Sequence, residues 1–147
     1  MNLHYSYFSV PNPLHILDKL LHPSRYQQQV SLRNKPVTVR WTRRAARELA
    51  RRNQPLLIEL QLYFTCVVKK RALFHDPGEI MGLEPIKVNQ DIELAFRTVQ
   101  AASCDPEEFA RSFPVKQEFR SGAAMKMAPR DVLLDFTSGG WVADFSI

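Results

Sequence analysis

Apolar and polar residues alternate over a long stretch in the middle of the chain. From Leu56 to Val68 every even position is apolar, whereas the odd positions from 59 to 71 include Glu59, Lys69 and Arg71. A repeat of two residues predicts a strand with one buried face. A straight strand over 56–74 would span roughly 60 Å, far beyond the usual length, so we expect a bend, bulge or break near 67–71.

A short strand and a helix are expected before this stretch. Alternation predicts a strand over 37–41, and Thr42 is a good N-cap for a helix that runs to about Arg52. Alanines and Leu49 form a narrow apolar stripe on this helix, which predicts close packing against a sheet. Three arginines at intervals of four residues share its outer face: Arg43, Arg47 and Arg51.

The remaining segments complete an α+β pattern. Leucines at helical spacing after Asn12-Pro13 predict an N-terminal helix that ends at Pro23, followed by a polar connector over 24–36. Further elements are expected as a strand over 86–96, a helix over 106–112, and two strands over 132–136 and 141–147 that a hairpin joins. This order predicts an α+β fold with a mostly antiparallel, mixed β-sheet, a covering Ala/Arg-rich helix and an N-terminal helix.

Length and composition place the chain among ordinary globular proteins. Its 147 residues, 45% apolar and 24% charged, fit a single domain. We expect residues 1–36 to form an N-terminal extension and residues 37–147 to form the α+β domain. The sequence shows no run of about 18 apolar residues and no signal-peptide pattern, so we expect a cytoplasmic protein that does not enter a membrane.

The net charge of +5 is unevenly distributed along the chain. Residues 1–74 hold thirteen Lys/Arg and three acids, whereas residues 75–147 hold seven and twelve. Basic side chains in the first half could bind a nucleic acid or an acidic protein. The residues of this candidate polyanion-binding set are Arg40, Arg43, Arg47, Arg51, Lys69, Lys70 and Arg71. A solvated basic helix, or a dipolar surface that aids self-association, would explain the same charges.

The two cysteines, Cys66 and Cys104, are too few and too widely spaced for a disulfide framework or a zinc site built from thiolates. Cys66 is the main candidate for a metal or cofactor ligand. The alternation also allows a plainer interpretation, in which Cys66 packs in the core between Phe64 and Val68. His75-Asp76 with Glu79 places further candidate ligands on one loop. Without a recognisable nucleophile, acid–base or phosphate-loop motif, the sequence favours a non-catalytic role and leaves an enzyme with an unrecognised pocket as an alternative.

Three segments carry a family resemblance. Residues 37–49 read Val-Thr-Val-Arg-Trp-Thr-Arg-Arg-Ala-Ala-Arg-Glu-Leu, residues 56–66 lead to Cys66, and residues 138–145 read Ser-Gly-Gly-Trp-Val-Ala-Asp-Phe. Together they resemble the HesB-like, A-type iron–sulfur biogenesis family, in which a short strand, an Ala/Arg-rich helix and a long strand precede the first cluster cysteine. The family's glycines around that cysteine and its closing Cys-Gly-Cys have no counterpart here.

The resemblance implies a HesB-like fold over residues 37–147 and a scaffold or carrier role in iron–sulfur biogenesis. Only Cys66 carries over as a ligand for iron or an iron–sulfur cluster. One thiolate cannot hold a cluster alone, so the resemblance also implies a second copy of the chain or another protein partner. A divergent accessory protein without a cluster is the alternative.

Overall fold

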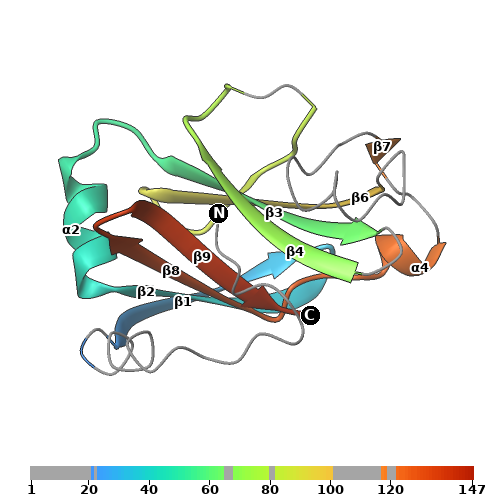
Figure 1. Cartoon of the computed structure of the whole chain (residues 1–147), viewed down its shortest axis with the longest axis horizontal. Coiled ribbons are helices and arrows are strands. Elements are labelled where there is room, and N and C mark those ends of the chain that lie inside the picture. Colours follow the sequence, from blue (N-terminus) through green and yellow to red (C-terminus); the bar gives the residue numbers. More distant parts are fainter. Residues whose placement is uncertain (1–20, 22, 65–67, 80–81, 101–116, 119–121) are drawn as a thin grey trace.

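Two mixed β-sheets pack face to face, and helix α2 lies at one end of the sandwich (Figure 1). This computed structural model describes residues 21, 23–64, 68–79, 82–100, 117–118 and 122–147. The elements follow one another as β1 (Ser24–Leu32), β2 (Lys35–Thr42), α2 (Arg43–Arg51), β3 (Leu56–Phe64), β4 (Val68–His75), β5 (Ile86–Lys87), β6 (Ile92–Gln100), β7 (Gln117–Glu118), α4 (Gly122–Met125), β8 (Asp131–Thr137) and β9 (Gly140–Ser146). The helices expected before Pro23 and over 106–112 lie outside the described residues.

Both sheets share one plan, a central parallel pair with an antiparallel neighbour on each side. The first sheet has the order β1-β2-β8-β9, and its parallel pair is β2 and β8. The second sheet has the order β4-β3-β6-β5, with β3 parallel to β6, and β7 also pairs with β6. The mixed sheet and the α+β character are therefore confirmed. The expected single sheet is wrong, because the strands divide into two.

The long alternating stretch is a hairpin and not one strand. β3 ends at Phe64, and β4 returns antiparallel beside it from Val68. Each pair in this ladder joins two even-numbered or two odd-numbered residues, as in Phe64 with Val68 and Leu60 with Ala72. Even positions therefore face the same side of the sheet in both strands, and the alternation continues unbroken through the reversal. The expected break near 67–71 falls close to where β4 begins.

Two other expectations also need correction. The expected strand over 86–96 is two antiparallel strands, β5 and β6, in which Ile86 again pairs with an even-numbered residue, Leu94. The polar segment 24–36, expected as a connector, contains β1, which pairs with β2 along its length. β1 is polar because it lies at the edge of its sheet, with most of its side chains exposed. The expected boundary between residues 36 and 37 falls inside β2.

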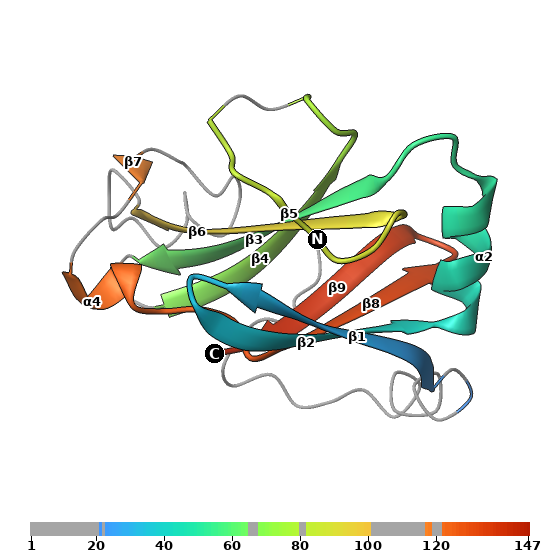
Figure 2. The same ribbon diagram turned by 180° about the vertical axis from the view of Figure 1, so that it is seen from behind.

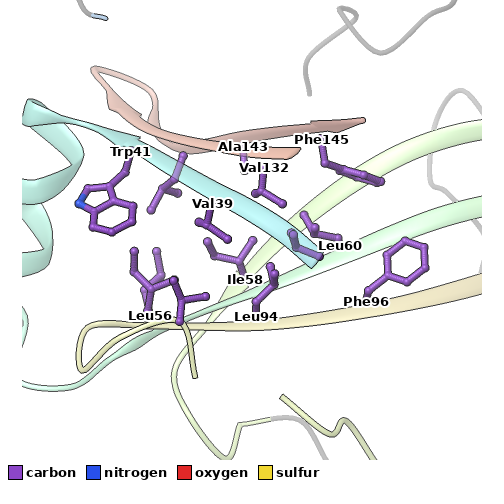
Figure 3. Close-up of a cluster of buried hydrophobic side chains, with 14 of the residues drawn as sticks. Val39, Trp41, Leu56, Ile58, Leu60, Leu94, Phe96, Val132, Ala143 and Phe145 are labelled. Atoms are coloured by element: carbon purple, nitrogen blue, oxygen red, sulfur yellow. The ribbon is translucent and has the colours of Figure 1, made fainter. Parts of the chain in front are cut away.

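The apolar faces of the two sheets form the core. Val39 and Val132 approach from one sheet, and Ile58, Leu60 and Leu94 approach from the other (Figure 3). All five side chains are at most 1% exposed. Burying a side chain of this size stabilises a fold by about 1.5–3 kcal/mol. Packing between the sheets therefore contributes several kcal/mol to the stability of the described part of the chain.

The Ala/Arg-rich helix α2 does not cover a sheet face. Figure 2 shows it at the end of the sandwich, where the chain passes from β2 in one sheet to β3 in the other. Ala45 and Leu49 are the buried residues of α2, and the helix contacts β1, β2 and β8. The two sheets already cover each other's apolar faces, so a covering helix is not needed there.

Candidate polyanion-binding surface

Helix α2 turns one face of arginines toward solvent. Thr42 begins the helix as an N-cap, since its Oγ1 accepts a hydrogen bond from the Ala45 backbone N–H at 3.2 Å. The buried positions Ala45 and Leu49 fix which side of the helix packs inward. Arg43 and Arg47 are therefore exposed on adjacent turns, as is Arg51 one turn further on.

These arginines differ in how far the protein neutralises them. Arg51 Nη1 lies 3.6 Å from Glu48 Oε2, and Arg40 Nη2 on β2 lies 3.8 Å from Asp131 Oδ1. The side chains of Arg51 and Arg40 are 79% and 48% exposed. Exposed pairs at such distances contribute little to stability. No ion pair joins Arg43 or Arg47 to any other residue among those that the structure describes. Their charges are balanced chiefly by solvent.

Arg44 has a different role, because it points back into the protein. Its Nε and Nη2 donate to Asp135 Oδ1 and Oδ2 at 2.7 and 2.6 Å, and the Thr42 hydroxyl donates to Oδ1 at 2.5 Å. Burial raises the pKa of Asp135, but the hydrogen bonds from Arg44 and Thr42 outweigh it and hold this pKa below its ordinary value. The network fixes the first turn of α2 to β8 and so sets the direction of the exposed arginines.

The structure does not bring the second basic cluster, Lys69 to Arg71, to this surface. These residues belong to β4, and Lys69 pairs with Tyr63 near the end of β3 that is farther from α2 (Figure 1). Within β4 their side chains alternate between the two faces of the sheet. Lys70 turns toward β9, where its Nζ donates to the Phe145 carbonyl at 2.5 Å and lies 3.1 Å from Asp144 Oδ1. The predicted set is thus split: Arg43, Arg47 and Arg51 on α2 form the candidate surface, whereas Arg40 lies on β2 next to Gln27 of β1.

The residues predicted to bind a metal do not form a recognisable metal site in the described part of the chain. Cys66 and Cys104 both lie outside the described residues. His75 Nε2 lies 2.9 Å from Glu59 Oε1 on β3, and its Nδ1 lies 3.9 Å from Glu79. No group of three His, Cys, Asp or Glu side chains among the described residues is arranged to hold a metal ion.

Sequence reasoning missed a buried polar cluster on the opposite face of β3. Glu59 and Gln61, expected on an exposed polar face, are 0% and 1% exposed. Glu59 Oε2 accepts from Arg97 Nε at 2.6 Å and from Gln61 Nε2 at 2.5 Å, while Oε1 faces His75. Burial raises the pKa of the neighbouring Tyr63, although the charge of Arg71 opposes this shift. The only signal in the sequence was a lone Glu-x-Gln within an apolar strand, which alternation alone assigns to solvent.

An exposed aromatic residue beside the basic surface was also missed. Tyr26 on β1 stacks on Trp41 with a centroid distance of 5.9 Å and an interplanar angle of 13°. Tyr26 is 44% exposed, whereas Trp41 is 9% exposed and belongs to the core. Because residues 24–36 were expected to form a polar connector, Tyr26 was not predicted to be part of a binding surface. Arg33 and Asn34 form the turn of this hairpin with positive φ, and Asn34 is the only residue type there that favours such a conformation.

Comparisons with known proteins leave the function open. No protein-family model, no curated protein and no solved structure matches the chain. The resemblance to the HesB-like family therefore stays a prediction from three sequence segments. Within the described residues, no helix is long and apolar enough to span a bilayer.

Proposed function

We propose that the protein is a non-catalytic binding protein whose surface around α2 binds a polyanion, either a nucleic acid backbone or an acidic protein partner. The observation that carries the proposal is the pair Arg43 and Arg47, which are exposed on adjacent helical turns with no ion pair to any described residue. Side chains four residues apart on a helix are neighbours, so two like charges meet there.

The position of Arg43 supports the proposal further. It occupies the first turn of α2, which contains no acidic residue. A helix N-terminus carries a partial positive charge, so a cation there is unfavourable by a few tenths of a kcal/mol to about 1 kcal/mol. The repulsion between Arg43 and Arg47 adds about 0.2–0.5 kcal/mol. A bound anion would relieve both costs, and nothing in the described packing requires either arginine.

Charge reversal tests this function directly. The Arg43→Glu/Arg47→Glu variant is compared with Lys87→Glu/Arg130→Glu, which makes the same charge change at two exposed residues away from α2. Fluorescence anisotropy is measured with a labelled oligonucleotide and with a labelled polyglutamate peptide. We expect affinity near the non-specific range, with a Kd of about 1–100 µM, and loss of binding only in the α2 variant. Equal loss in both variants, or no binding to either probe, would contradict the proposal.

A second candidate function follows from the resemblance to the HesB-like family, namely an accessory protein that binds iron or an iron–sulfur cluster through Cys66. It is supported by the order of β2, α2 and β3, which is the strand, helix and strand that the resemblance leads us to expect. Anaerobic purification with iron and sulfide analysis tests it, with Cys66→Ser as the variant and Cys104→Ser as the control. Metal content that does not depend on Cys66 would contradict it. Light scattering on the same samples tests the predicted self-association.

A further inference from the structure

We infer that the surface around α2 binds single-stranded nucleic acid and that Tyr26 is the platform on which a base stacks. This inference deepens the proposed function and rests on it. It commits to nucleic acid rather than an acidic protein. An aromatic side chain beside arginines can stack on the exposed face of an unpaired base, and an acidic protein has no such base.

The first argument is the rigidity of the platform. One face of the Tyr26 ring lies nearly parallel to Trp41, with 13° between the ring planes. Trp41 is held in the core beside Val39 and Leu56 (Figure 3). The supported ring therefore loses little conformational freedom when a ligand stacks on it, and its 44% exposure leaves surface for that contact.

The second argument is the position of Tyr26 next to the arginines. In the β1–β2 ladder Ser24 pairs with Thr42, the N-cap of α2, and Tyr26 pairs with Trp41. Figure 2 shows the start of β1 beside α2, and the two elements are in contact. Arg43 follows Thr42 directly, so the platform and the basic helix face begin within a few residues of each other. A strand whose phosphates lie along α2 could place a base on Tyr26.

The third argument is the open edge that β1 provides. Residues 24–29 are all exposed, and among the described strands β1 pairs only with β2. Gln28 shares a strand face with Tyr26 at a spacing of about 6.6 Å, which is close to the separation of neighbouring bases in an extended single strand. Its amide offers both a donor and an acceptor to a base edge. Gln27 lies on the other face, paired with Arg40.

A duplex does not fit this arrangement. Its bases are stacked on one another, so they present only their edges in the grooves. The arginines would still contact duplex phosphates, but Tyr26 would add nothing to the affinity. The preference for single strands over duplexes is therefore assigned to Tyr26, and the overall electrostatic attraction is assigned to Arg43 and Arg47.

The test compares the binding of one labelled single-stranded oligonucleotide of about ten nucleotides with the binding of its duplex. We expect Tyr26→Ala and Tyr26→Leu to weaken single-strand binding about 5- to 100-fold and to leave duplex binding unchanged. Tyr26→Phe keeps the ring and should bind like the wild type. Gln27→Ala, on the opposite face of β1, is the matched control and should also be unchanged. Tyr26→Leu preserves an apolar contact with Trp41, so it separates loss of stacking from loss of the β1 fold.

Fluorescence provides an independent readout. In Tyr26→Trp the new exposed indole should be quenched by the single strand and not by the duplex. If Tyr26→Leu lowers the affinity for the single strand and for the duplex equally, or lowers neither, the stacking role of Tyr26 is refuted. If Arg43→Glu/Arg47→Glu abolishes binding while Tyr26→Leu has no effect, the platform fails and the proposed function stands. If only polyglutamate binds, the inference fails and the acidic-protein form of the proposed function stands.

Discussion

Arg44 donates hydrogen bonds to both carboxylate oxygens of Asp135, at 2.7 and 2.6 Å, and thereby joins the first turn of α2 to β8. This bidentate pair lies beside two arginines that have no such partner among the described residues. Within the first turns of α2, Arg44 therefore has a structural role, whereas Arg43 and Arg47 are exposed to solvent. The orientation of the proposed binding surface depends on the pair, because it fixes the rotation of α2 relative to the sandwich.

Asp135 should make stability depend on pH. Burial raises its pKa, but the hydrogen bonds from Arg44 and Thr42 lower it by more, so the folded-state pKa lies below the ordinary value of 3.8. The contribution of ionised Asp135 to the free energy of unfolding is therefore fully present above pH 3.8. It is lost as the pH falls through the lower, folded-state pKa. Asp135→Asn should cost about 1–3 kcal/mol at pH 7, and the difference from the wild type should shrink below about pH 4. Urea denaturation at both pH values measures it, and a difference that is independent of pH would refute this assignment.

The buried Glu59 cluster should respond unequally to the loss of its two charged members. Arg97→Met leaves the fully buried Glu59 carboxylate without its cation, and we expect a loss of about 3–5 kcal/mol. Glu59→Gln keeps the shape and leaves Arg97, whose side chain is 30% exposed, able to reach solvent, so we expect about 1–3 kcal/mol. Free energies of unfolding from urea titrations provide the comparison. The opposite order of the two losses would show that Arg97 is not the partner that stabilises the carboxylate.

Lys70 should hold the edges of the two sheets together. Its Nζ bonds to the Phe145 carbonyl and to Asp144, and it lies 5.5 Å from the centre of the Phe145 ring. Lys70→Met keeps the apolar stem and removes these contacts, so we expect a loss of about 1–2 kcal/mol. Lys87→Met, at an exposed position on β5, is the control and should change stability by less than about 0.5 kcal/mol. Equal effects of both variants in thermal denaturation would contradict the role of Lys70.

The turn that connects β1 to β2 should be sensitive to residue type. Arg33 and Asn34 have φ values of 52° and 63°, which glycine and asparagine adopt easily and β-branched residues do not. Asn34→Val should destabilise the protein by about 1–2 kcal/mol, whereas Asn34→Gly should be close to neutral. The two variants are compared by urea denaturation. A neutral Asn34→Val would mean that the hairpin does not depend on this turn.

The elements that sequence reasoning identified are those whose pattern determines their environment. The strand over 37–41, the Thr42 N-cap and the hairpin at Thr137 to Gly140 are present, because alternation, capping and turn chemistry act locally. The β3–β4 reversal was missed because the paired residues Phe64 and Val68 keep the same parity, and periodicity carries no information about chain direction. β1 was missed because an edge strand needs no apolar face.

The candidate site was predictable only in part. The spacing of Arg43, Arg47 and Arg51 placed them on one helix face, and that face is exposed. The separation of Lys69 to Arg71 from this face depends on which strands pair, which local patterns do not encode. Burial of Glu59 was unpredictable for a similar reason, since its partners Arg97 and His75 come from two neighbouring strands.

The central claim, that Arg43 and Arg47 contact the phosphates of a nucleic acid, is tested most directly by the salt dependence of binding. The affinity for a single-stranded oligonucleotide is measured between about 50 and 200 mM salt for the wild type, Arg43→Ala/Arg47→Ala and the control Lys87→Ala/Arg130→Ala. Each lost phosphate contact should reduce the slope of log K against log salt by about 0.7 for a single strand. We predict a slope shallower by about 1.4 in the α2 variant and an unchanged slope in the control. An unchanged slope in the α2 variant would contradict the claim.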